Sequence, residues 1–293
     1  MKTKNLRSTF KKRYLLLLLV FLYIGVQQSG CFSFRQSDEK QCDYLMERQQ
    51  EMPVFPRYEM EGRNMQYTQV GGKEEDERPV VLFIHGSPGS SEAYLDYLAD
   101  TSLSQEAVLL SVDRPGFGYS DFGKTERSLE KQSLLMEPIL DSFATRKIIL
   151  VGHSYGGPLA ARMAMDFPDR IGGLVMVAPS IDPELEPPIW WRKIVDWWGI
   201  RWMIPSSLRV CNQEILPLKG ELERMMPLWA KITAPATVIQ GSKDKLVPKG
   251  NADFAQRMLT NSQTVTIDIV EGGNHFILWT EMPRVKNAIR EMF

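Results

Sequence analysis

Cysteine and histidine are scarce in this sequence: each occurs three times among 293 residues. Cys31, Cys42 and Cys211 are too few for a disulfide scaffold. Their spacing also matches no zinc-binding motif, and we expect no metal site. A net charge of −1 leaves no basic surface of the kind that binding to nucleic acid requires. A composition with 43% hydrophobic and 24% charged residues excludes collagen-like and wholly disordered chains. The length fits one large α/β domain with an inserted lid.

The first 30 residues contain no Asp or Glu. Their basic residues are Lys2, Lys4, Arg7, Lys11, Lys12 and Arg13. An apolar run follows, Tyr14–Val26, which suits a signal peptide but is short for a membrane span of ~20 residues. The small residues Ser29 and Gly30 before Cys31 resemble a lipobox, in which the cysteine becomes lipidated, although Gln28 stands where an aliphatic residue is usual.

We therefore expect residues 1–30 to direct export to a cell envelope. Lipidation of Cys31 would attach the chain to a membrane surface, and the alternatives are simple secretion and an uncleaved anchor. The polar residues 31–51 are predicted to be a tether. For Cys42 and Cys211 the alternatives are a disulfide in an oxidising compartment and two unrelated thiols. The oligomeric state is left open.

From about residue 52 the sequence alternates between strand and helix patterns. A predicted hairpin, Arg57–Met60 with Met65–Val70, comes first. Short apolar runs typical of buried strands are Val80–Ile84, Ala107–Val112, Lys147–Val151, Gly173–Val177, Ala236–Gln240 and Thr264–Val270. Helical periodicity is found at Glu92–Ala99, Ser128–Phe143, Tyr155–Phe167, Ala252–Leu259 and Arg284–Met292. This alternation predicts an α/β fold with a mostly parallel, doubly wound sheet, its core formed by residues 52–180 and 232–293.

One segment, residues 181–231, interrupts this alternation. It has several prolines, no strand-like run and six of the seven tryptophans, so we predict an inserted helical lid. Aromatic rings bury a large area each, and we expect some of them to line an apolar pocket for an acyl or aromatic group. The candidates are Trp190, Trp191, Trp197 and Trp198.

A G-x-S-x-G motif, Gly152-His-Ser154-Tyr-Gly156, lies between a predicted strand and a predicted helix. A nucleophile on such a tight turn needs flanking residues without a Cβ, because backbones approach closely there. The helix behind the turn favours developing negative charge near its N-terminus. The motif therefore predicts Ser154 as a nucleophile.

Several motifs together resemble the α/β-hydrolase fold family, from about Pro53 to the C-terminus. His85-Gly-Ser87-Pro-Gly89 is similar to the family's HGxPG loop, and the resemblance implies an oxyanion hole from the backbone N–H groups of Ser87 and Tyr155. Asp113-Arg-Pro-Gly-Phe-Gly-Tyr-Ser120 is similar to a family turn that shapes the floor of the pocket.

The resemblance also implies the catalytic acid and base. Asp244 and His275 match the acid and the histidine of the family, in the family's order after the serine. Each follows the C-terminal end of a predicted strand, where open α/β sheets place ligands. A serine hydroxyl needs an imidazole to take its proton and a carboxylate to orient that imidazole. Asp182 is the alternative acid, and His85 and His153 are predicted to have structural roles.

We expect a serine hydrolase that cleaves an ester of a small or medium apolar acyl group. The alternatives are thioesters, amides or carbon–carbon bonds on the same triad, and a non-catalytic binding protein with this fold. Gly118–Thr125 fits a P-loop pattern, but a Pro-Gly turn separates it from its strand, which argues against nucleotide binding. No Gly-rich dinucleotide motif follows a strand, so we expect no organic cofactor.

Overall fold

The computed structural model describes Tyr14 and residues 33–48, 51–72, 76–188 and 190–293. The prediction for Cys31 and nearly all of the predicted export segment lie outside these residues. In the part of the chain that is described, no helix combines the length and the apolar character that crossing a membrane requires.

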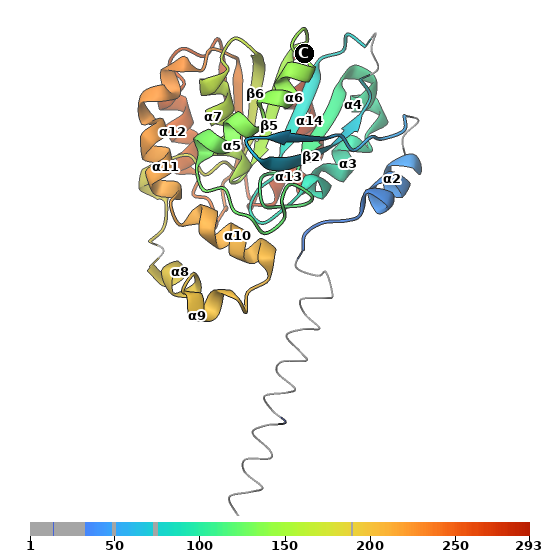
Figure 1. Cartoon of the computed structure of the whole chain (residues 1–293). Coiled ribbons are helices and arrows are strands. Elements are labelled where there is room, and N and C mark those ends of the chain that lie inside the picture. Colours follow the sequence, from blue (N-terminus) through green and yellow to red (C-terminus); the bar gives the residue numbers. More distant parts are fainter. Residues whose placement is uncertain (1–13, 15–32, 49–50, 73–75, 189) are drawn as a thin grey trace, which may run out of the picture.

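A single eight-stranded sheet forms the centre of the molecule (Figure 1). Its strands are β1 (Arg57–Met60), β2 (Arg63–Val70), β3 (Val80–Ile84), β4 (Val108–Val112), β5 (Ile148–His153), β6 (Ile171–Val177), β7 (Ala236–Gly241) and β8 (Val265–Val270). Their order across the sheet is β1-β2-β4-β3-β5-β6-β7-β8. The hairpin β1–β2 and the pair β2–β4 are antiparallel, and every pair from β4 to β8 is parallel. The predicted α/β fold with a mostly parallel sheet is confirmed.

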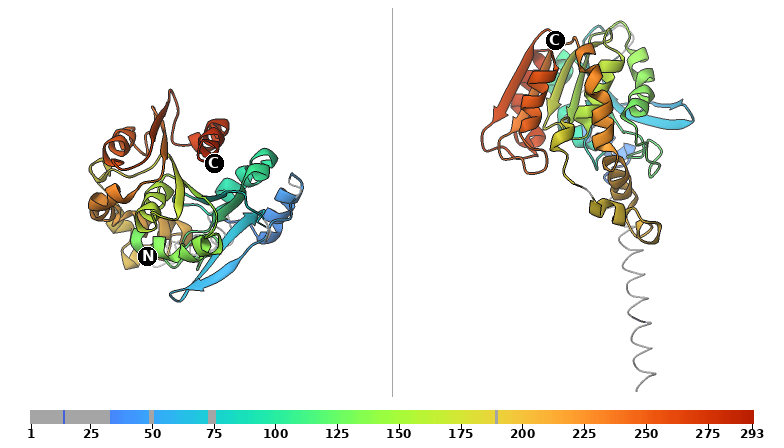
Figure 2. Two further views of the ribbon diagram at one scale, coloured as in Figure 1. Left: turned by 90° about the horizontal axis from the view of Figure 1, so that it is seen from above. Right: turned by 90° about the vertical axis from the view of Figure 1, so that its left-hand side faces the viewer.

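Both faces of the central strands are buried, because helices cover the sheet on either side (Figure 2). Side chains alternate along a strand, so Val80, Leu82 and Ile84 of β3 join one apolar core, while Val81 and Phe83 join the other. The first core contains α5 (Leu129–Leu135), α6 (Glu137–Ser142), α7 (Gly156–Asp166) and α12 (Gly250–Met258). The second contains η1 (Ser91–Tyr94), α3 (Leu95–Leu98), α4 (Thr101–Glu106), α13 (Ile277–Thr280) and α14 (Met282–Arg290).

The predicted tether is shorter than residues 31–51, because residues 38–46 form helix α2 (Asp38–Met46). Ser37 caps this helix by accepting a hydrogen bond from the Lys40 backbone N–H. The helix docks onto the domain through Leu45, which is fully buried in the second core. A buried hydrogen bond from Thr68 Oγ1 on β2 to Gln41 Oε1, 3.0 Å long, adds a polar contact.

Residues 181–231 form the predicted helical insertion, and none of its described residues lies in a strand. Its elements are η2 (Pro183–Leu185), α8 (Trp190–Val195), α9 (Trp198–Arg201), α10 (Ser206–Ile215), α11 (Leu218–Met225) and η3 (Met226–Lys231). Helices α8 and α9 extend beyond the body of the domain at one end, and α10 connects them to it, as Figure 1 and the right view of Figure 2 agree.

Candidate active site

Ser154 occupies a strained turn between β5 and α7. Its φ is +54°, in the left-handed region that residues with a side chain rarely adopt. The backbone around it is packed too tightly for side chains. A Cβ on Gly152 would lie 2.3 Å from the carbonyl oxygen of Gly156, and a Cβ on Gly156 would lie 2.1 Å from that of Ile84. The two glycines of the motif are therefore steric requirements of this turn.

His275 and Asp244 are hydrogen-bonded to each other, although they are 31 positions apart in the sequence. The distance from His275 Nδ1 to Asp244 Oδ2 is 2.8 Å, and the Asp244 side chain is fully buried. Its other oxygen accepts hydrogen bonds from the backbone N–H groups of Leu246 and Val247, at 2.8 and 2.9 Å. Burial alone would raise the pKa of Asp244, but the hydrogen bonds from His275 and these N–H groups lower it below its ordinary value. This carboxylate is ionised at neutral pH and can orient the imidazole.

Asp182, the alternative acid, lies in a different environment. Its side chain caps η2 by accepting a hydrogen bond of 2.9 Å from the Glu184 backbone N–H, and one oxygen is 4.0 Å from Arg257. The carboxylate paired with His275 is thus that of Asp244.

Ser154 and His275 both line a cavity of about 660 Å³ at the edge of the sheet. Its polar wall includes Ser87 on the HGSPG loop, and Phe276 contributes to its apolar wall. No hydrogen bond joins the hydroxyl of Ser154 to His275, two residues that the structure describes fully. Such catalytic contacts are often long before a substrate binds. The cavity therefore brings the predicted nucleophile and the histidine–aspartate pair to one place.

The four tryptophans predicted to line the pocket do not line this cavity. Trp190, Trp191, Trp197 and Trp198 are 70%, 46%, 54% and 72% exposed, because α8 and α9 extend away from the domain. The tryptophan that does line the cavity is Trp279, on α13. Its only sequence signal is its position one helical turn after the predicted catalytic histidine.

Two further wall residues, Phe34 and Gln36, come from the segment predicted to be a tether. The Arg35 side chain between them donates a hydrogen bond of 3.1 Å to the Gly118 carbonyl and lies 4.5 Å from the ring centre of Phe122. Nothing in the local sequence indicates this position, since the contact depends on the tertiary fold.

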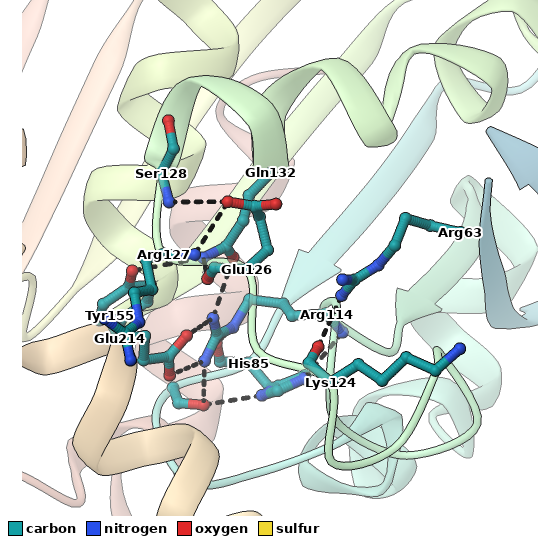
Figure 3. A network of polar contacts seen from close by, with 11 residues as sticks. Arg63, His85, Arg114, Lys124, Glu126, Arg127, Ser128, Gln132, Tyr155 and Glu214 are labelled. Atoms are coloured by element: carbon teal, nitrogen blue, oxygen red, sulfur yellow. Dashed lines mark hydrogen bonds and ion pairs between the residues drawn. The ribbon is translucent and has the colours of Figure 1, made fainter. Parts of the chain in front are cut away.

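The backbone N–H groups of Ser87 and Tyr155, predicted to form an oxyanion hole, make no hydrogen bond within the described residues. The Gly86 carbonyl belongs to the same peptide unit as the Ser87 N–H. It accepts hydrogen bonds from His85 Nδ1 at 2.7 Å and from Arg114 Nη2 at 3.1 Å (Figure 3). The N–H and the C=O of a trans peptide point in opposite directions, so these contacts fix the direction of the Ser87 N–H.

Arg114 is the centre of this network and is fully buried. It forms a bidentate ion pair with Glu214 of α10, with N–O distances of 2.7 and 2.9 Å, and neither side chain is exposed to solvent. Its Nε donates to the His85 carbonyl at 2.9 Å, and its guanidinium lies 4.5 Å from the ring centre of Tyr155. Burial alone would lower the pKa of Arg114, but Glu214 raises it. The Asp113–Ser120 turn thus connects the insertion to the HGSPG loop, and, contrary to the prediction, its residues do not line the cavity.

His85 and His153 are both held neutral. Burial, and then the charge of Arg114, lowers the pKa of His85 well below its ordinary value. The Arg114 backbone N–H donates to His85 Nε2 at 3.0 Å, so the proton of this imidazole is on Nδ1. Burial, and then His275, lowers the pKa of His153 to about 4. His153 Nε2 is 3.1 Å from the His275 carbonyl, a contact that holds the loop carrying His275.

The chain is similar to known proteins in both sequence and fold. The sequence profile of the α/β hydrolase fold matches residues 79–199. A crystal structure described as a membrane phospholipase A and bacterial virulence factor superposes with a TM-score of 0.62 and 16% identity, over 100% of this chain and 98% of that one. This chain has the α/β-hydrolase fold.

Proteins similar to this chain in sequence include a lipase and a thioesterase. Human monoglyceride lipase is 23% identical over 250 residues, which are 71% of this chain and 79% of the lipase. A human mitochondrial palmitoyl-protein thioesterase is 29% identical over 221 residues, 70% of this chain and 68% of that protein. A shorter match of 30% identity over 121 residues covers 41% of this chain and only 31% of the acetyltransferase component of the acetoin cleaving system from Cupriavidus necator. The fold and the lipase-like and thioesterase-like relatives support a hydrolase.

Cys42 on α2 and Cys211 on α10 are both free thiols in the structure. The segment with the P-loop pattern is part of the folded turn: the hydroxyl of Ser120 accepts a hydrogen bond of 2.9 Å from the Gln66 backbone N–H, and Gly118 and Gly123 have positive φ.

Proposed function

We propose that this protein is a serine hydrolase that cleaves an ester or related acyl bond through an acyl-enzyme on Ser154. The observation that carries the proposal is the His275–Asp244 hydrogen bond of 2.8 Å, made by a histidine that shares a cavity with a serine on a strained, glycine-flanked turn. This arrangement has the nucleophile, the base and the orienting acid that such catalysis requires.

The proposed reaction has two balanced steps. In the first, His275 takes the proton of Ser154 as Oγ attacks the acyl carbon, and then returns this proton to the leaving alcohol. In the second, His275 takes a proton from water as the water oxygen attacks the acyl carbon. It then returns this proton to Ser154 Oγ as the bond between Oγ and the acyl carbon breaks, which releases the acid and the free serine. In both steps the N–H groups of Ser87 and Tyr155 stabilise the oxyanion, and Asp244 stabilises the imidazolium.

The cavity supports a small or medium apolar acyl group as the substrate. Its volume of about 660 Å³ is within the range of small-molecule pockets, ~300–1,000 Å³. Leu246, Phe276 and Trp279 supply its apolar wall. A thioester is the second candidate, because the thioesterase relative acts on such a bond by its name. The ratio of kcat/KM for p-nitrophenyl esters and for acyl thioesters of the same chain length distinguishes the two.

A fluorophosphonate probe tests the nucleophile. We expect mass spectrometry to place one phosphonyl group on the peptide containing Ser154, and the variant Ser154→Ala to lose about 10³–10⁶-fold in kcat on p-nitrophenyl esters. The matched control is Ser90→Ala, which removes another hydroxyl of the same cavity wall and should remain active and labelled. A label on another residue, or a Ser154→Ala protein with most of its activity, would refute the proposal.

We also propose that the chain is exported and that Cys31 is lipidated. The basic start, the apolar run and the small residues before Cys31 support this. Intact-mass analysis of the protein from the envelope fraction tests it: we expect a diacylated N-terminal cysteine, and a chain that retains residues 1–30 or lacks lipid would contradict lipidation.

A further inference from the structure

Helices α8 and α9 and the residues after them present a dense group of exposed apolar side chains, which we call the tryptophan surface. Its members are Trp190, Trp191, Ile194, Trp197, Trp198, Trp202 and Met203. Each of them is between 46% and 72% exposed. All seven lie within 14 consecutive residues, and the ring centres of Trp197 and Trp198 are 5.4 Å apart. Single exposed apolar residues are ordinary, but such a concentration of them is typical of a binding surface.

The composition of this surface matches a lipid surface. Tryptophan is enriched at the boundary between the headgroups and the acyl chains, and basic residues beside it attract anionic lipids. The exposed basic residues within 190–203 are Lys193 and Arg201, since Arg192 donates a hydrogen bond to Asn212 Oδ1 on α10, and the segment contains one acid, Asp196. The Asp196 carboxylate faces α10, where it accepts a hydrogen bond of 2.8 Å from Gln213 Nε2.

The start of the described chain places the cavity near the predicted membrane attachment. Phe34 lines the cavity, three residues after Cys31 and eight residues after the apolar run ends at Val26. Three residues reach at most about 10 Å and eight at most about 28 Å. Attachment through a lipid on Cys31 or through the uncleaved apolar run would therefore hold the cavity close to the bilayer. The segment of residues 33–37, which leads into α2, begins at the end of the domain from which α8 and α9 extend, in Figure 1 and in the right view of Figure 2.

The mouth of the cavity is apolar as well. Leu246, Phe276 and Trp279 line it and are 63%, 53% and 39% exposed. An acyl chain that leaves a bilayer can therefore enter along apolar side chains, without its methylene groups becoming fully exposed to water. Each methylene kept from water contributes about 0.8 kcal/mol.

We propose that the tryptophan surface docks on a lipid bilayer and that the cavity receives its substrate from there: an amphiphilic ester or thioester with an apolar acyl chain. The docking stands on the exposed side chains and on the position of Phe34. The choice of substrate rests on the proposed function as a serine hydrolase.

The test uses the full-length chain in phosphatidylcholine vesicles that contain phosphatidylglycerol. A variant with Trp190, Trp191, Trp197 and Trp198 changed to Ser is compared with the natural chain. The matched control changes two exposed apolar residues outside the tryptophan surface, Met52→Ser and Val54→Ser. Two activities are measured for each protein: hydrolysis of a soluble short-chain p-nitrophenyl ester, and hydrolysis of a fluorogenic lipid with a medium-length ester chain, held in the vesicles by its other acyl chain.

We expect the four substitutions to lower vesicle-borne hydrolysis about tenfold and to leave soluble turnover within about twofold, since they remove the apolar contact with the interface and do not touch the cavity. Vesicles with brominated acyl chains should quench a large fraction of the tryptophan emission of the natural chain and a smaller fraction of that of the variant. The control protein should match the natural chain in all three measurements.

Three results would overturn the docking. They are an equal quenched fraction in both proteins, an equal loss of soluble and vesicle-borne turnover, and a self-association that depends on the tryptophans and occurs without quenching. Failure of the proposed function is separable from these results. If Ser154→Ala retains its activity while the natural chain shows tryptophan-dependent quenching, the hydrolase mechanism is wrong and the docking stands.

Discussion

Removal of the carboxylate of Glu214 tests how the insertion supports the HGSPG loop. In Glu214→Ala the guanidinium of Arg114 remains fully buried without its counter-ion. Loss of one partner of a buried ion pair costs about 3–5 kcal/mol of the free energy of unfolding. For a domain of this size 1 kcal/mol corresponds to roughly 2–4 °C, so we expect the melting temperature to fall by about 6–20 °C.

A double variant separates stability from catalysis. Arg114→Met with Glu214→Leu removes both charges, so the cost of an unpaired buried charge disappears. The His85 carbonyl loses its donor, and the Gly86 carbonyl keeps only that of His85. One unpaired buried carbonyl costs about 1–3 kcal/mol. Complete loss of one oxyanion donor lowers kcat by about 10²–10³-fold. In the double variant the Ser87 N–H is still present but less firmly oriented, so we expect kcat to fall by about 10–100-fold, with little change in KM.

The assay combines urea denaturation with kcat and KM on a soluble p-nitrophenyl ester. The natural chain, Glu214→Ala and the double variant are compared under one set of conditions. A Glu214→Ala protein that is as stable as the natural chain would refute the assignment of a buried, essential ion pair. A double variant with normal kcat would show that Arg114 acts on stability alone and does not hold the Ser87 N–H.

Three further predictions follow from the site and its packing. Asp244→Asn should lower kcat on p-nitrophenyl esters by about 10³–10⁴-fold and leave the circular dichroism spectrum unchanged, whereas Asp182→Asn should remain within a few-fold of the natural chain. Burial lowers the pKa of His153 to about 4, whereas a histidine in the unfolded chain has a pKa near 6.5. The free energy of unfolding should therefore fall by up to about 3 kcal/mol through this group as the pH falls from 6.5 to 4, and urea titrations of His153→Gln should show a smaller fall over the same range. Gly156→Ala, whose Cβ would meet a backbone oxygen of β3 at 2.1 Å, should destabilise the fold by more than ~3 kcal/mol in urea titrations. The control is Gly220→Ala in the first turn of α11, where a Cβ would meet only Arg224 Nη1 at 3.8 Å, and it should stabilise the fold by up to ~1 kcal/mol.

The features that were predictable from the sequence are those with a local signal. The strand Val80–Ile84 has the predicted bounds, because a buried parallel strand is a short continuous apolar run. The turn at Ser154 was predictable because it requires glycine at fixed positions. The placement of Asp244 and His275 at one edge follows from the rule that parallel strands end together.

The features that were not predictable depend on which way a side chain faces, or on contacts between residues far apart in the sequence. Helix α2 has few apolar residues, and the sequence does not show that Leu45 among them is buried. The tryptophans of residues 181–231 were correctly assigned to a helical insertion, but composition alone does not say whether a ring faces inward. The ion pair of Arg114 with Glu214 joins residues 100 positions apart, and no periodicity connects them.

The order of the strands in the sheet also determines when a newly made chain acquires its proposed chemistry. Ser154 follows β5, in the centre of the sheet, whereas Asp244 and His275 follow β7 and β8, which are added last at one edge. A ribosome that has made residues up to β6 has produced the Ser154 turn without the proposed acid and base, because the chain is made from its N-terminal end. Under the proposed mechanism, the nascent protein gains activity toward acyl bonds only after β8 and His275 have left the ribosome and β8 has paired with β7.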